Sequence, residues 1–120
     1  MIEILDGELD ALISTPAVGK RRHSCTRRVV IYLTAGPREV SWLARTQNIS
    51  QEGVAVMAAR PFDLGLSLTF EVETTRRTGH CRLEGLVVHA TPRDLNQWLV
   101  GCKLATVMTP NELQEFLDEI

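Results

Sequence analysis

Three segments with different hydrophobic patterns follow one another along this chain. In residues 1–14 the apolar side chains recur at helical spacing, with acidic residues between them. From residue 27 to residue 104 apolar and polar residues largely alternate, which is typical of strands with one buried face. Helical spacing returns in residues 109–120. We therefore expect a mainly β domain with a short helix at each end.

Turn residues divide the alternating region into six short strands. The residues near 27–35, 40–45, 54–56, 66–73, 81–89 and 98–104 have strand character. A Gly36-Pro37-Arg38 turn follows the first of these strands, and a polar loop at 74–79 joins the fourth to the fifth. Six short strands separated by such turns predict a barrel or a sandwich. On their strands, Trp42, Trp98 and His89 align with apolar neighbours, so we expect core positions for them, and a core or rim position for Tyr32.

Both helices have sequence signals at their boundaries. In the N-terminal segment the apolar positions are Ile2, Leu5, Leu9, Leu12 and Ile13. Thr15-Pro16 ends this helix, because a residue before proline avoids the helical region. Thr109, Pro110 and Glu112 combine an N-cap, a first-turn proline and a capping-box carboxylate. We therefore divide the chain into a helix and linker at 1–18 and a barrel domain at 19–120, of which 109–120 is the C-terminal helix.

Composition restricts the class of protein. A chain of 120 residues with 44% hydrophobic residues is expected to form one domain with a real core. Its net charge of -2 disfavours a nucleic-acid polymer as ligand. No apolar run is long enough to span a bilayer, and acidic residues stand where a signal peptide has cations. We expect a cytoplasmic protein with reduced cysteines.

The positive charge is concentrated just before the first strand. Lys20, Arg21, Arg22, Arg27 and Arg28 are five of the 13 Lys and Arg residues, and all lie within residues 20–28. A local cluster of guanidinium groups on a chain of nearly neutral net charge suits one compact anion better than a long polyanion. We call residues 19–28 the basic arm. A solvated basic linker is the alternative interpretation.

The turn from Asn48 to Gly53 is the second candidate site. Asn48 either accepts hydrogen bonds from a ligand or caps the turn through its own backbone. Ser50 either donates its hydroxyl to a ligand or closes the turn locally. Gly53 is expected to have a positive φ and to let a ligand approach the backbone. The turn alone does not distinguish a binding site from a plain hairpin.

Together the basic arm and this turn resemble the PilZ domain, a bacterial receptor module for cyclic di-GMP. The family signature is an RxxxR arm followed, two strands later, by [D/N]xSxxG. The second half is matched by Asn48, Ser50 and Gly53. The first half departs from the signature, since four residues rather than three separate Arg22 from Arg27. A bulge outside the barrel would absorb the extra residue.

The resemblance implies a six-stranded antiparallel β-barrel and a nucleotide site. Arg22 and Arg27 would be the principal ligand arginines, with Arg21 and Arg28 as alternates, because the guanidinium fork suits both phosphate and guanine. Asn48, Ser50 and Gly53 would complete the ligand-binding set. An amide in place of the family's more frequent Asp would weaken binding by about 1 kcal/mol. Bound as an intercalated pair, the ligand would bring four phosphate charges to the arm.

The sequence also bears on other functions: a protein-interaction adaptor, an RNA-binding protein, an enzyme and a metal-binding protein. The main alternative is a PilZ-like protein-interaction adaptor that binds no nucleotide and uses the terminal helices as its surfaces. An RNA-binding barrel is a third hypothesis, disfavoured by the net charge. The chain has no Gly-rich phosphate loop and no GxSxG motif, so we do not expect an enzyme. His23, Cys25, His80, Cys81 and Cys102 lack zinc-site spacing, so we expect no metal and no cofactor.

Overall fold

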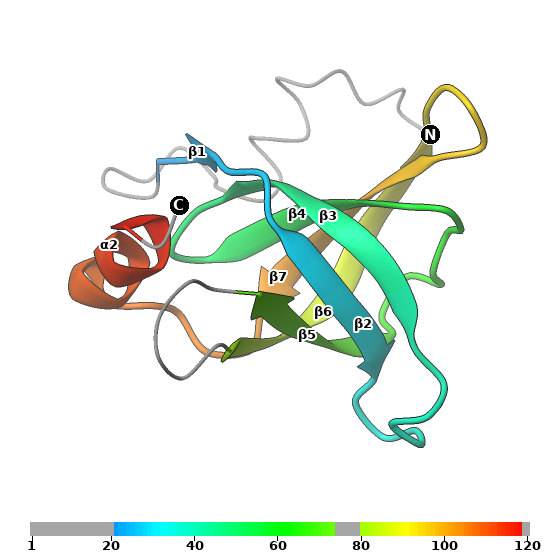
Figure 1. Cartoon of the computed structure of the whole chain (residues 1–120), viewed down its shortest axis with the longest axis horizontal. Helices are drawn as coiled ribbons and strands as arrows, with labels where there is room; N and C mark the ends of the chain where they lie inside the picture. The colour runs from blue at the N-terminus through cyan, green and yellow to red at the C-terminus, as the bar shows by residue number, and fades with distance from the viewer. Residues whose placement is uncertain (1–20, 74–79, 119–120) are drawn as a thin grey trace.

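The computed structural model describes residues 21–73 and 80–118, which form seven strands and one helix (Figure 1). The predicted N-terminal helix at 1–14 and the predicted loop at 74–79 lie outside the described residues. The elements are β1 (His23–Ser24), β2 (Arg28–Leu33), β3 (Trp42–Ile49), β4 (Gly53–Ala58), β5 (Ser67–Glu73), β6 (His80–Pro92), β7 (Trp98–Leu104) and α2 (Pro110–Asp118).

Strands β2 to β7 form a closed antiparallel barrel. The strand order is β3-β2-β5-β6-β7-β4, and an additional β3–β4 pairing joins the two ends of the sheet. The predicted six-stranded barrel is therefore confirmed. The sandwich considered as its alternative is not observed. Closure leaves the backbone groups of these strands paired on both sides over most of their length.

The barrel interior holds the main hydrophobic core. Alternate residues of each strand point inward, as Val29 and Ile31 of β2 and Val54 and Val56 of β4 do. Trp42 and Trp98 are partly buried and pack against this core, as predicted. Tyr32 is 5% exposed, and its hydroxyl bonds to Glu71 and Arg82. It faces outward opposite Thr69, so it belongs to the rim rather than the core.

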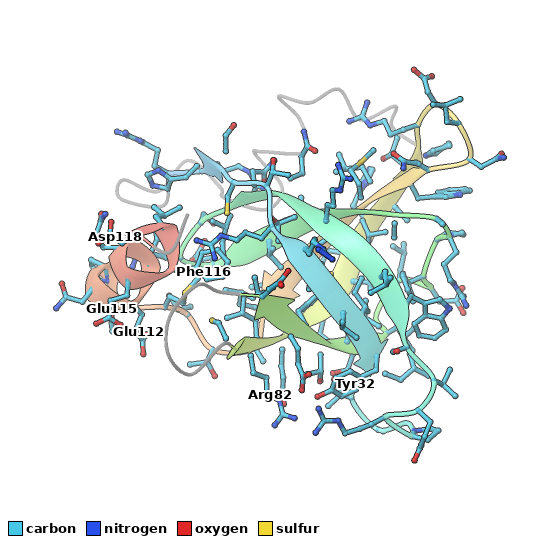
Figure 2. All side chains as sticks on the ribbon, in the orientation of Figure 1. Tyr32, Arg82, Glu112, Glu115, Phe116 and Asp118 are labelled. Carbon is cyan, nitrogen blue, oxygen red and sulfur yellow. The ribbon has the colours of Figure 1, made fainter. Side chains whose placement is uncertain are left out.

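Helix α2 covers one end of the barrel and begins at the predicted capping box. The Thr109 N–H donates to Glu112 Oε1 at 2.8 Å, and the Glu112 N–H donates to Thr109 Oγ1 at 3.1 Å. Leu113 and Phe116 are buried against the core. Figure 2 shows Phe116 on the side of α2 that faces the barrel, and the acidic Glu112, Glu115 and Asp118 on the side away from it. Within residues 21–73 and 80–118 no helix is long and apolar enough to cross a membrane.

Candidate functional site

The basic arm and the Asn48–Gly53 turn lie side by side. In β1, Ser24 pairs with Asn48 and His23 pairs with Ile49, the last residue of β3 before the turn. The Cys25 N–H extends this pairing by donating to the Gln47 carbonyl at 3.2 Å. The arm therefore runs along β3 as a short added strand, and the two halves of the sequence motif meet on one side of the barrel.

A bulge absorbs the extra residue of the arm. Strand β2 pairs with the same edge of β3 as β1 does, beginning with Arg28 opposite Arg45. Between the pairs Ser24–Asn48 and Arg28–Arg45 the chain takes four steps along the arm and three along β3. One residue in 25–27 is thus additional. The sheet therefore accommodates the four-residue gap between Arg22 and Arg27 as a bulge.

Thr46 holds this bulge in shape. Its hydroxyl accepts a hydrogen bond from the Arg27 N–H at 2.7 Å and donates to the Cys25 carbonyl at 2.7 Å. The Thr46 N–H donates to the Arg27 carbonyl at 2.8 Å. Thr46 is 1% exposed, so these bonds are shielded from water. One buried threonine thereby satisfies the backbone groups that the bulge would otherwise leave without partners.

Arg27 points into the end of the barrel rather than toward the turn. It is buried, and Nη1 donates to the Glu73 carbonyl at 3.2 Å. Nη2 donates to the Phe116 carbonyl of α2 at 2.9 Å, and the guanidinium stacks on the Phe116 ring at 5.2 Å. A cation bonded to the last turn of a helix is favourable. In this structure Arg27 joins the arm, β5 and α2, a role that the sequence did not predict.

The other arginines of the arm have different surroundings. Arg28 is exposed on the outer face of β2, with Nε 3.6 Å from Glu73 Oε1. It lies opposite Arg45, three residues along β3 from Asn48. Arg21 is exposed and Arg22 is partly buried. Both come directly before β1, so their backbone lies next to the end of β3 at which the turn begins.

Ser50 closes the turn locally, which is one of the two roles considered for it. Its N–H donates to the Gly53 carbonyl at 2.8 Å, and its Oγ accepts from the N–H groups of Glu52 and Gly53 at 3.2 Å each. Ser50 is 0% exposed. The hydroxyl of Ser50 thus fixes the shape of the turn from inside.

Gly53 does not have the conformation that the sequence analysis expected. Among the described residues, positive φ occurs at Gly65, Leu95 and Asn96. Gly53 instead begins β4 as an ordinary extended residue opposite Lys103. The prediction of a positive φ was wrong because the Ser50 hydroxyl bonds stabilise the turn without a left-handed residue at its end.

The Asn48 side chain carries an unused acceptor. Its Oδ1 is buried and has no hydrogen-bond partner within the described part of the chain. The alternative role for Asn48, capping the turn through its own backbone, is therefore not seen for this oxygen. Because an unpaired buried carbonyl costs about 1–3 kcal/mol, such an atom calls for an explanation. A ligand that donates an N–H from above the turn would supply one.

His89 lies on the outer face of the barrel, which corrects the face assigned to it from sequence. Val87 pairs with the core residue Cys102, but a register shift follows and His89 pairs with Gly101. The bulge at Val88 therefore turns His89 away from the interior. His89 is still buried, and its ring bonds to the Thr91 hydroxyl at 2.8 Å. The predicted core position of His89 is therefore wrong, although the ring is buried and hydrogen-bonded.

A continuous row of outward positions links this histidine to the arm. Successive pairings across five strands join Ser24 to Asn48, Asn48 to Ala55, Ala55 to Gly101, and Gly101 to His89. We call these residues the outer row. Its middle positions, Ala55 and Gly101, are small and buried. Sequence alternation alone does not reveal the row, because bulges in β3 and β6 shift the register.

The described residues contain no group of three or more His, Cys, Asp or Glu that would hold a metal ion. Burial raises the pKa of Cys102 to about 12, and it also raises the pKa of Cys81 despite the opposing charge of Arg27. All three cysteines are free. Burial therefore keeps the Cys81 and Cys102 thiols in the neutral form rather than activating them as nucleophiles or ligands.

The described chain is a closed six-stranded barrel capped by a helix, with a cationic arm along the Asn48–Gly53 turn. The chain matches the PilZ domain over residues 20–119 and belongs to that family, whose members are cyclic di-GMP receptor and adaptor modules rather than enzymes. Its fold is similar to that of the Bacillus subtilis inhibitor of motility (MotI/DgrA), with a TM-score of 0.60 and 17% identity. That match covers 85% of this chain and 48% of the other, so this chain spans about half of that protein. No curated protein matches the chain.

Proposed function

We propose that this protein binds cyclic di-GMP between the basic arm and the Asn48–Gly53 turn, in a cytoplasmic signalling role. The observation that carries the proposal is the buried, unpaired Oδ1 of Asn48 beside β1. The N1–H and N2–H groups of guanine are donors that suit such an acceptor. Arg21 and Arg22 supply cationic forks for the phosphates.

The seven candidate residues then fall into three groups: ligand contacts, residues that hold the turn and the arm in shape, and one residue that adds charge. Arg21, Arg22 and Asn48 contact the nucleotide. Ser50 and Gly53 shape the turn, while Arg27 and Thr46 fix the path of the arm. Arg28 adds charge from the outer face of β2. This assignment differs from the sequence-based one chiefly in moving Arg27 from a ligand contact to an anchor, as its bonds to α2 favour.

Signal output is proposed to pass through α2. The turn is bonded to the segment before the helix, since Gln51 Nε2 donates to the Met108 carbonyl at 2.8 Å and the Met108 N–H donates to the Gln51 carbonyl at 2.9 Å. Arg27 provides a second link, from the arm to Phe116. A ligand that draws the arm and the turn together therefore changes the position of α2 on the barrel. The acidic outer side of α2 (Figure 2) is the surface that a downstream protein would contact.

Titration calorimetry of the full chain tests the proposal. We expect heat at micromolar cyclic di-GMP, lost or reduced at least about tenfold in affinity in Arg22→Ala. Arg82→Ala is the matched control, because it removes the same charge from β6, and it should bind as the wild type does. Cyclic di-AMP, whose adenines lack the N1–H donor, should bind far more weakly. A flat wild-type trace would refute nucleotide binding.

An adaptor that binds no nucleotide is the second candidate. It is favoured by the commitment of Arg27 to α2, which leaves fewer arm cations for phosphates. Similarity to an inhibitor of motility is compatible with either function, since at 17% identity it concerns the fold alone. The flat trace that refutes the first candidate is the result that this one predicts.

A further inference from the structure

An outward-facing apolar cluster includes Ala55 of the outer row. Ala55 and Leu99 form a hydrophobic cluster separate from the barrel core, with Met57 packed against it. Their strand neighbours Val54, Val56 and Val100 belong to the interior core. Because side chains alternate along a strand, Ala55, Met57 and Leu99 face outward. We call Ala55, Met57 and Leu99 the outer cluster.

The outer cluster is more buried than an open sheet face allows. Ala55 is 0% exposed, Leu99 is 4% exposed, and His89 of the outer row is 7% exposed. Elsewhere on the outer face, Leu43 of β3 is 80% exposed and Leu86 of β6 is 46% exposed. A leucine on the outside of a barrel reaches this degree of burial only when something packs over it. The outer cluster therefore has a cover.

Two cations border this face. Arg45 is the outward partner of Met57 in β3, and Lys103 is the outward partner of Gly53 in β7. Both are exposed. An occupant with apolar side chains for the outer cluster and carboxylates for its borders would match the face in both respects.

We propose that residues 2–13 of this chain occupy the outer cluster. Their apolar residues Ile2, Leu5, Leu9, Leu12 and Ile13 recur at the spacing of one helical stripe. Glu3, Asp6, Glu8 and Asp10 supply the carboxylates. The described chain begins at Arg21, two residues before His23, and β1 pairs with β3 beside Asn48.

This docking does not rest on the proposed function, because the cations that border the outer cluster, Arg45 and Lys103, are not the arginines assigned to the nucleotide. Absence of nucleotide binding would leave the docking itself untouched, so the two proposals fail separately.

Thiol protection tests the docking directly in the full chain. In a Cys81→Ser background the remaining native thiols are buried, and Ala55→Cys places a probe in the outer cluster. N-ethylmaleimide should label this probe at least about a hundredfold more slowly than the exposed probe Leu43→Cys. Adding Leu5→Ser and Leu9→Ser should raise the Ala55→Cys rate at least about tenfold, with the thermal unfolding temperature little changed. Ala11→Ser, off the apolar stripe, should leave the rate unchanged.

Two results would overturn the proposal. Labelling of Ala55→Cys as fast as that of Leu43→Cys would show that the cluster has no cover in solution. Protection that persists in the Leu5→Ser, Leu9→Ser variant would show that another occupant covers it, and a dependence of that protection on protein concentration would identify the occupant as a second copy of the chain.

Discussion

The Arg27 guanidinium donates to the Phe116 carbonyl at 2.9 Å and stacks on the ring of the same residue. This contact joins the basic arm, at the start of the domain, to the last turn of its C-terminal helix. An arginine that belongs to a ligand motif by sequence is thus part of the packing between the barrel and α2.

Arg27 should therefore contribute strongly to stability. Arg27→Ala should lower the free energy of unfolding by about 2–4 kcal/mol, because it removes one buried and one partly buried charged hydrogen bond as well as the ring contact. Arg27→Lys should recover part of this loss, since an ammonium keeps the charge without the fork. Urea unfolding gives the values. Arg28→Ala, at an exposed site, should cost less than about 1 kcal/mol. Equal losses for Arg27→Ala and Arg28→Ala would contradict the anchor role.

The bulge in the arm should depend on one hydroxyl. Thr46→Val keeps the shape of the side chain but leaves the Arg27 N–H and the Cys25 carbonyl without their partner. We expect a loss of about 1–3 kcal/mol in unfolding free energy and faster hydrogen exchange in residues 23–27. Thr26→Val, at an exposed position of the same arm, is the control. Unchanged exchange in Thr46→Val would show that the bulge is held by other contacts.

Substitution of Asn48 should mainly change nucleotide affinity, whereas substitution of Ser50 should mainly change the free energy of unfolding. Asn48→Leu removes the unpaired acceptor, so it should abolish cyclic di-GMP binding with little loss of stability. Ser50→Ala removes two turn bonds, so it should cost about 1–3 kcal/mol in unfolding free energy. Asn48→Asp should tighten binding by about 1 kcal/mol, roughly fivefold, because a carboxylate accepts from both guanine donors. Calorimetry and urea unfolding measure the two effects. Weaker binding by Asn48→Asp would argue that this side chain faces phosphate rather than guanine.

Cys102 should make the fold sensitive to alkali. Burial raises its pKa from 9.0 to about 12, so above pH 9 the unfolded chain loses this proton while the folded chain keeps it. The stabilising contribution of the neutral thiol is complete below pH 9 and is lost as the pH rises toward 12. Cys102→Ala should lower stability at neutral pH through a small cavity, and should flatten the fall in unfolding free energy across this range. If the unfolding free energies of the wild type and Cys102→Ala fell in parallel with pH, Cys102 would not be the cause of the alkaline loss of stability.

Much of the fold is predictable from the local sequence. The alternation in β5 and the Thr109–Glu112 capping box involve residues close in sequence. Both features can therefore be predicted without knowledge of the tertiary structure. The positions of Arg27 and His89 depend on bulges in the sheet, and a shift of one residue turns a side chain to the opposite face. The sequence indicates that the arm is cationic, but it does not indicate which of its arginines points inward.

The turn shows a similar limit. The sequence predicts a glycine-dependent turn at Gly53, whereas the buried hydroxyl of Ser50 supplies the stabilising bonds. Both residues belong to the recognised motif, so the location of the turn was right while the physical role of one residue was not. The unpaired oxygen of Asn48 becomes visible only when its neighbours in β1, β3 and β4 are placed around it.

The most direct test of the account follows the Asn48 side chain during a titration with cyclic di-GMP. Nitrogen-edited NMR spectra of the full chain should show saturable shifts of the Asn48 side-chain amide and of the backbone amides of residues 21–24, with cyclic di-AMP giving no comparable change. Spectra in which these signals stay in place at saturating cyclic di-GMP would contradict a nucleotide site between the arm and the turn.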